Sequence, residues 1–208
     1  FWANSWYPNH YSWYENELPD GSLVSEHVEA VDGLFQDSGV QGWLITKSWA
    51  DAEGIVSMDQ INDTPALYEA LDTDGDGVGE ILGCPEDWTC DDTQEQMIAF
   101  AGWDNLVQTK AGYDALFAEF VNRVRAGDPG VMYTWTPSSY VVEMVPGVDV
   151  YWLSIEEDSV LDDSNPLGMS GGESQSQGDG FRDAPADTCT QPCQLGWEAA
   201  DIQVSARS

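Results

Sequence analysis

Four acidic side chains spaced around two glycines form the strongest chemical pattern in this sequence. They are Asp72, Asp74, Asp76 and Glu80. Side-chain oxygens at alternate positions converge on a hard cation such as calcium when Gly75 and Gly77 permit a sharp turn. A site saturated with protein oxygens indicates a structural ion rather than a catalytic one. Because ordinary turns also prefer Asp and Gly, an ion-free turn is the alternative.

Two pairs of cysteines form the next pattern. Cys84 and Cys90 enclose Trp88, and Cys189 and Cys193 lie near the carboxyl end. The short spacing within each pair predicts two local disulfides and an oxidising compartment. A loop as short as the first removes about 2 kcal/mol of chain entropy from the unfolded state, and it would hold Trp88 in place. Zinc is the alternative, but the two pairs and both histidines are far apart in the sequence.

The net charge of the chain limits the kinds of molecule that it can bind. The chain has 38 Asp and Glu residues against 6 Lys and Arg, a formal net charge of −32. Such a surface repels nucleic acid and anionic lipid and favours cationic ligands. An acidic proteome from a saline habitat is an equal explanation, and it predicts a melting temperature that rises with NaCl concentration. No apolar run approaches the roughly 18 residues of a membrane-spanning helix.

The chain of 208 residues is long enough for one sizeable core, or for one core and part of another. It begins at Phe1 without an initiator Met or a signal peptide, which predicts a processed or partial chain. Residues 1–20 hold three of the ten tryptophans around Pro8 and His10. We expect a strand end followed by an aromatic loop there, and a role in the core or in binding is equally open.

The remaining segments predict an α/β protein. Residues 24–35 suit a helix or a strand, and the segment QDSG divides them from a strand at 40–46. Residues 196–206 form a final strand. The expected helices are 48–53, 58–62, 65–71, 92–102 and 111–126, with Ser57 and Thr64 as caps. A strand over 131–135 places Trp135 at its carboxyl end, where ligands bind in open α/β sheets, before a helix that starts at Thr136-Pro137. A strand follows at 148–155, and 156–194 reads as a flexible loop.

Four motifs carry a resemblance to a known family. They are NSWYPNH at 4–10, GWLITKSWAD at 42–51, DTDGDGVGEILGCPEDWTC at 72–90 and YTWTP at 133–137. In this order the chain resembles the glycine betaine/proline betaine-binding proteins of ABC importers. The resemblance implies a periplasmic-binding-protein-like (type II) fold of two lobes, here mostly one lobe plus a remnant of the other. The expected division is 1–42 for the remnant and crossover, 43–196 for the nearly whole lobe, and 197–208 for a returning strand.

The resemblance also implies which residues bind ligand. Trp6, Trp88 and Trp135 would form a box around a quaternary ammonium group through cation–π attraction. His10 and the backbone amides of Thr89 and Cys90 would contact the ligand's carboxylate. The implied protein is a monomeric, periplasmic or otherwise extracytoplasmic subunit. It would deliver glycine betaine or a related solute to an ABC permease in the membrane for osmoprotection.

Two other classes compete with this interpretation. A calcium-stabilised carbohydrate-binding module would also present exposed tryptophans, but the alternation of helices and strands weighs against it. An enzyme is the third class, and no nucleophile motif or paired acid and base stands out in the sequence. We therefore expect a binding protein rather than an enzyme.

Overall fold

The computed structural model describes residues 2–7, 9–161, 184–191, 193–197 and 199–207. The strands are β1 (Trp2–Tyr7), β2 (Val28–Thr46), β3 (Gly79–Leu82), β4 (Leu106–Thr109), β5 (Val131–Thr136), β6 (Val150–Leu153) and β7 (Ala200–Arg207). The α-helices are α1 (Tyr11–Tyr14), α2 (Lys47–Glu53), α3 (Met58–Asp63), α4 (Pro65–Leu71), α5 (Thr89–Ala101), α6 (Tyr113–Ala126) and α7 (Ser139–Glu143). Short 3-10 helices cover Val24–Glu26 and Glu157–Ser159.

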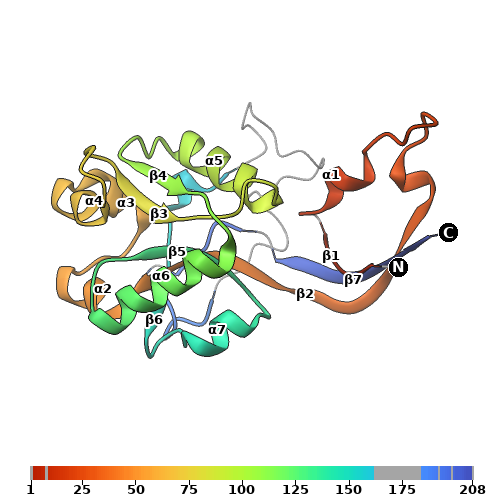
Figure 1. Cartoon of the computed structure of the whole chain (residues 1–208). Helices are drawn as coiled ribbons and strands as arrows, with labels where there is room; N and C mark the ends of the chain where they lie inside the picture. Colours follow the sequence, from red (N-terminus) through yellow and green to blue (C-terminus); the bar gives the residue numbers. More distant parts are fainter. Residues whose placement is uncertain (1, 8, 162–183, 192, 198, 208) are drawn as a thin grey trace.

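The elements form two parts of very different size (Figure 1). One part, called the body here, contains the described residues of 40–161 and 184–197. The other, called the arm, contains those of 2–39 and 199–207. Strand β2 belongs to both, because Val40–Ile45 pairs with β5 in the body while Val28–Gly39 pairs with β7 in the arm. Both chain ends lie on the arm, which extends from one side of the body (Figure 1).

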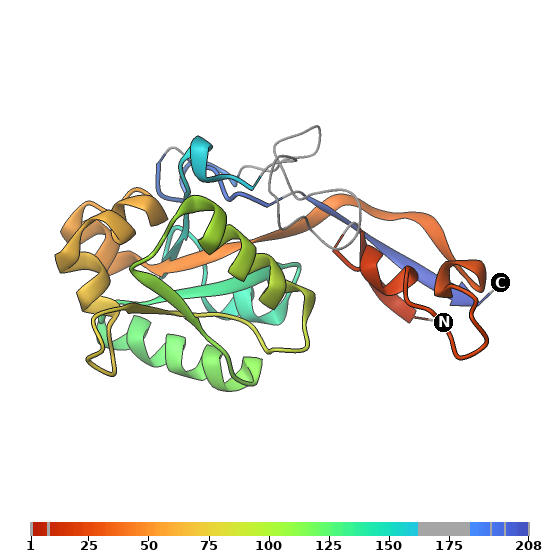
Figure 2. The same cartoon turned by 90° about the horizontal axis from the view of Figure 1, so that it is seen from above.

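The sheet of the body is mixed. Strands β3 and β4 are parallel neighbours, and β3 is also parallel to β5. Strand β2 runs antiparallel to both β5 and β6. Because the chain leaves β3 towards β4 and then returns past β3 to β5, right-handed crossovers place α5 and α6 on opposite faces, as Figure 2 shows.

The main core fills the space between this sheet and its helices. Helix α6 contributes the predicted stripe, with Leu116, Phe117, Phe120 and Val121 buried. It ends at Gly127, whose φ of 77° is the left-handed conformation that glycine adopts most easily. The predicted cap of α3 is also present, since the Ser57 hydroxyl accepts a hydrogen bond from the backbone amide of Gln60. The apolar stripe of α6 and the cap of α3 were therefore predicted correctly. Thr64 is the N-cap residue of α4, as predicted, but its side chain makes no capping hydrogen bond.

Three details of the sequence interpretation were wrong. QDSG does not divide two segments, because β2 continues through it, with irregular register between Val31 and Gly39. Thr136 does not cap a helix, because Ser138 is the N-cap of α7 and its hydroxyl accepts a hydrogen bond from the Val141 amide. Strands β3 and β4 were not expected, since four residues are too short for a clear period.

Both predicted disulfides are formed. Cys84 is bonded to Cys90 and Cys189 to Cys193, so the zinc alternative has no thiolates left. The expected flexible segment 156–194 lies outside the described residues at 162–183 and 192. Its described end packs on β6, where the Trp152 amide donates to the carbonyl of Thr188. Among the described helices, none has the length and apolar character needed to cross a membrane.

Candidate functional site

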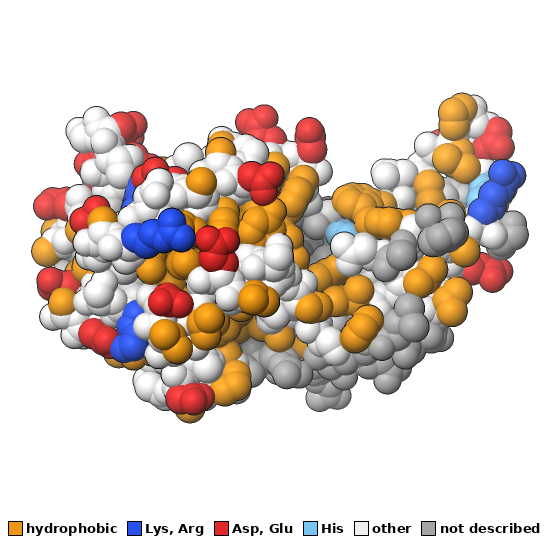
Figure 3. All heavy atoms as spheres, turned by 60° about the horizontal axis from the view of Figure 1, so that its bottom comes forward, with side chains coloured by type: hydrophobic (Ala, Val, Ile, Leu, Met, Phe, Trp, Pro, Cys, Tyr) orange, Lys and Arg blue, Asp and Glu red, His pale blue; other side chains and the backbone are white. Residues whose placement is uncertain are grey.

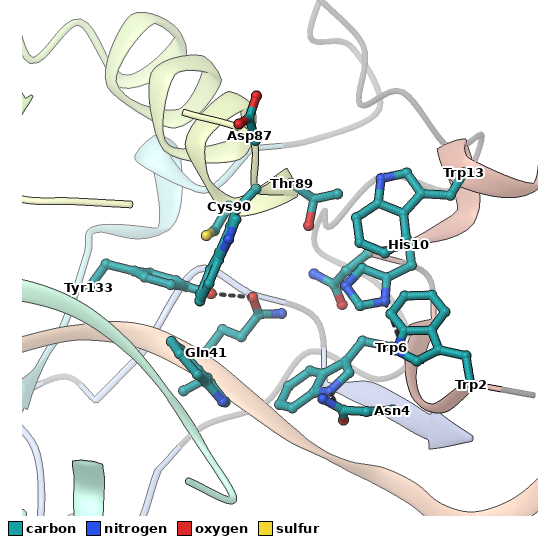
Figure 4. Close-up of a pocket in the computed structure, with 13 residues that line it drawn as sticks. Trp2, Asn4, Trp6, His10, Trp13, Gln41, Asp87, Thr89, Cys90 and Tyr133 are labelled. Atoms are coloured by element: carbon teal, nitrogen blue, oxygen red, sulfur yellow. Dashed lines mark hydrogen bonds between the residues drawn. The ribbon is translucent and has the colours of Figure 1, made fainter. Parts of the chain in front are cut away.

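A cavity of about 440 Å³ lies between the body and the arm. Figure 3 shows hydrophobic side chains on both sides of the hollow that separates the two parts. The residues that line the cavity are Trp2, Asn4, Trp6, Asn9, His10, Trp13, Gln41, Asp87, Trp88, Thr89, Cys90, Tyr133 and Trp135. They come from both parts of the molecule, so neither part forms the cavity alone (Figure 4).

The body side of the cavity is built on the carboxyl ends of two adjacent parallel strands. Trp88 follows β3 in the disulfide loop, and Trp135 lies near the end of β5. The connections after these strands depart in opposite directions, and ligands bind at such a switch point in open α/β sheets. The Trp88 and Trp135 rings are 5.7 Å apart at an angle of 64°. Tyr113, which is not among the lining residues, stacks on Trp88 with ring centroids 5.8 Å apart.

The disulfide loop also places backbone donors beside the cavity. Helix α5 begins at Thr89 directly after its N-cap Trp88. The first amide groups of a helix have no acceptor within the helix and carry its positive dipole end. The amides of Thr89 and Cys90 are therefore suited to an anionic group at this end of the cavity.

The arm side supplies Trp6, which is 7% exposed. Its indole nitrogen donates to the Asn4 side chain at 2.7 Å. Its ring lies close to Gly39: a Cβ atom added to that glycine would be only 2.6 Å from the ring. Gly39 therefore makes room for Trp6, and Asn4 sets the orientation of the indole.

His10 is neutral and faces the same cavity. Burial lowers the pKa of His10 to about 4. Its Nδ1 accepts a hydrogen bond from the Trp6 amide at 3.0 Å, so the neutral ring carries its proton on Nε2 as a donor. Trp2 and Trp13 stack on the imidazole, with ring centroids 4.9 and 4.3 Å away.

The six residues that the resemblance marked as ligand-binding all line this one cavity. The sequence reasoning missed Asn4, Asn9, Gln41, Asp87 and Tyr133, and it noted Trp2 and Trp13 only as members of an aromatic stretch. A signal for Gln41 was present, because it is a polar residue in alternation with Trp43 and Ile45, which are fully buried.

The lining is suited to a ligand that carries a cationic group together with a carboxylate or hydroxyl group. The described lining residues include aromatic ring faces and the carboxylate of Asp87, and neither Lys nor Arg. Ring faces attract cations, most strongly when water is excluded. The donors are neutral: the His10 imidazole and the first amides of α5. Such a site accommodates a quaternary ammonium group beside a carboxylate or hydroxyl.

The acidic loop lies at the other end of β3, about 13 Å of strand from the disulfide loop. One side-chain oxygen from each of Asp72, Asp74, Asp76 and Glu80 lies within 4.8 Å of the others. Asp72 accepts from the amides of Gly75 and Gly77, and these bonds lower its pKa. The loop thus gathers four carboxylates by folding them onto backbone donors.

Comparison with known proteins identifies the family. A family model for the substrate-binding domain of ABC-type glycine betaine transport systems matches residues 1–190. The chain is 32% identical over 166 residues to the glycine betaine/proline betaine-binding periplasmic protein of Escherichia coli K12, covering 79% of this chain and 48% of that protein. It is 32% identical over 156 residues to the glycine betaine-binding periplasmic protein OusX of Dickeya dadantii, covering 74% and 45%. The chain spans about half the length of these relatives.

Solved structures support the fold. A choline-binding protein of an ABC transporter, in complex with choline, is similar with a TM-score of 0.57 at 15% identity over 99% of this chain and 54% of that one. The glycine betaine and L-proline-binding protein of Borrelia burgdorferi gives a TM-score of 0.53 at 12% identity over 82% and 52%. At these identities the likeness establishes the fold alone, and it confirms the predicted type II periplasmic-binding-protein class with partial coverage.

The family consists of transporter substrate-binding domains, which confirms the expectation of a binding protein rather than an enzyme. With nearly its whole length matched, the chain belongs to the family of substrate-binding domains of ABC-type glycine betaine transport systems.

Proposed function

We propose that this chain is part of an extracytoplasmic subunit that captures glycine betaine or a related quaternary-ammonium solute for an ABC importer. Trp6, Trp88 and Trp135 surround the ammonium group, while His10 and the amides of Thr89 and Cys90 bind the carboxylate. The subunit delivers the solute to its membrane permease for osmoprotection, and it works in the periplasm or an equivalent compartment, as its relatives do.

The observation that carries the proposal is the convergence of three tryptophans and a set of neutral donors on one cavity. Trp6 comes from the arm, and Trp88 and Trp135 come from two different strand ends of the body. A trimethylammonium group cannot donate a hydrogen bond, so ring faces are the groups that hold it. Neutral donors suit a zwitterion better than an arginine would, because a second cation would repel the ammonium group.

Energetics require all of these groups together. Each indole contributes about 0.5–2 kcal/mol of cation–π attraction. Association costs about 4–15 kcal/mol in lost translational and rotational freedom. Three rings alone therefore do not suffice, and the carboxylate contacts together with exclusion of water supply the remainder.

A tryptophan-fluorescence titration tests the proposal. Glycine betaine should produce a saturable change, and glucose, the control sugar, should produce none. Trp88→Ala and Trp135→Ala should each weaken betaine binding at least about tenfold, since each removes one ring face. Trp49→Phe is the matched control, because Trp49 is buried in α2 away from the cavity. A response to glucose instead of betaine would favour the carbohydrate-binding alternative.

The acidic loop holds a structural calcium ion in this proposal. Its support is the gathering of four carboxylate oxygens within 4.8 Å of one another around two glycines with positive φ, Gly75 and Gly77. Like charges at this separation repel one another, and a divalent cation offsets that repulsion. The ion would stabilise the turn before β3 without touching the ligand cavity.

Thermal unfolding with calcium or with a chelator tests the metal site. Calcium should raise the melting temperature, since any ion that binds only the folded state stabilises it. Asp74→Asn should remove most of this increase, whereas Asp128→Asn, at an exposed aspartate outside the loop, should preserve it. Equal melting curves with calcium and with chelator would exclude the site.

A further inference from the structure

Gln41 is a buried polar residue of the cavity that the proposed function leaves without a role. It lies on β2 directly opposite Trp135 of β5, and the side chains of such a pair share one face of the sheet. Only 5% of Gln41 is exposed, although it lines the cavity. A buried amide in a ligand cavity needs partners for its oxygen and for both of its N–H groups.

The oxygen of Gln41 has its partner. The Tyr133 hydroxyl donates to Oε1 at 2.6 Å, as the dashed line in Figure 4 shows. Burial raises the pKa of Tyr133 well above its ordinary value, so this hydroxyl keeps its proton. Tyr133 is held in turn by Tyr113, whose hydroxyl donates to the Tyr133 carbonyl at 2.9 Å. This chain of donors fixes the amide with its oxygen towards Tyr133 and its nitrogen away from it.

The nitrogen of Gln41 has no partner within the described structure. Its Nε2 is buried and makes no hydrogen bond there. Figure 4 shows it on the side of the amide that faces Trp6 and His10 across the cavity. Leaving such a donor unsatisfied is unfavourable, and an acceptor on a bound ligand would recover that loss.

We propose that Gln41 Nε2 donates a hydrogen bond to the carboxylate of the bound zwitterion and selects carboxylate-bearing betaines over choline. This inference rests on the proposed function. An amide N–H group is repelled by the ammonium end of the ligand and attracted by its anionic end. A carboxylate has about four lone-pair sites, enough for Gln41, His10 and the amides of Thr89 and Cys90 together.

Paired titrations with glycine betaine and choline test the role of Gln41. Both ligands carry a trimethylammonium group, and only glycine betaine carries a carboxylate. Gln41→Met keeps the length of the side chain and removes the donor. It should weaken glycine betaine binding about 10- to 100-fold, the range for a hydrogen bond to a charged group, and change choline binding much less. Gln203→Met, at a buried glutamine of β7 outside the cavity lining, is the control and should leave both affinities unchanged.

A purely structural role would give a different result. Equal losses for both ligands, or no loss for either, would overturn the selective contact. The side-chain oxygen of Asn9 is another buried unpartnered atom of the lining. If Gln41 instead donated to Asn9 across the cavity, Asn9→Ala would reproduce the Gln41→Met result with both ligands, and that outcome also rejects the proposal.

Failure of the proposed function is distinguishable from failure of this inference. If the wild-type chain bound neither glycine betaine nor choline, both would fall. If the wild type bound glycine betaine and Gln41→Met bound it equally well, only the role of Gln41 would fall. Tyr133→Phe adds a positioning test: it frees the amide to rotate, so it should reduce the preference for glycine betaine by less than Gln41→Met does.

Discussion

The body and the arm contribute to one cavity but are stabilised very differently. The body has one continuous core, which includes Trp43 of β2 and Trp197, and many of its side chains are fully buried. The core of the arm consists of Trp6, Ala200 and Ile202. Large apolar side chains of the arm remain exposed, including Phe35 at 56%.

This contrast shows that the arm side of the candidate site rests on a part with little core of its own. Burial of apolar surface is the main source of stability, so the arm depends on its strand pairing and on contact with the body. Trp135 makes that contact, because it packs against both hydrophobic clusters. A residue proposed to bind ligand therefore also joins the two parts.

The largest predicted effect compares the two cores directly. Phe120→Ala removes a fully buried ring from the body, which should cost about 3–5 kcal/mol of unfolding free energy in urea denaturation. Ile202→Ala in the arm should cost less, because the small cluster around it can collapse into the space. Its effect should be seen as faster amide hydrogen exchange confined to β1 and β7. Equal losses of global stability would contradict the contrast between the parts.

The next prediction tests the arm side of the cavity. Gly39→Ala would place a methyl group 2.6 Å from the Trp6 ring and displace it from the cavity. We expect about a tenfold loss of betaine affinity by fluorescence titration, comparable to the loss of one cation–π contact. Gly112→Ala is the control, since an added Cβ there meets nothing within 4 Å. Unchanged affinity in Gly39→Ala would show that Trp6 does not need its present position.

A further effect concerns His10 and pH. Burial lowers the pKa of His10 in the folded state from 6.5 to about 4, so between these values the unfolded chain binds a proton that the folded chain does not. The stability of the wild type relative to His10→Gln should therefore fall as the pH decreases from about 6.5 to 4 and stay constant above that range. Denaturant titrations of both proteins at several pH values measure this difference. A constant difference across the range would mean that His10 is not buried in the arm.

Local patterns allowed much of the fold to be predicted. The helices have clear apolar stripes and capping residues, such as Ser57 before α3 and Gly127 after α6. The short strands β3 and β4 were missed because pairing with their neighbours, rather than local sequence, stabilises them. QDSG was interpreted as a break for the opposite reason: its residues favour turns, but pairing with β7 keeps β2 extended through this region.

Residue types and spacing alone identified the candidate chemical groups: the indoles, the imidazole, the short disulfide loop and the acidic loop. The partners of Gln41, in contrast, depend on how the strands pair. Its place opposite Trp135 and beneath the Tyr133 hydroxyl follows from the antiparallel register of β2 and β5. Residues far apart in sequence meet through such pairings, and the free energy of packing and burial selects the register. The cavity also depends on tertiary structure, because its lining residues come from both the arm and the body.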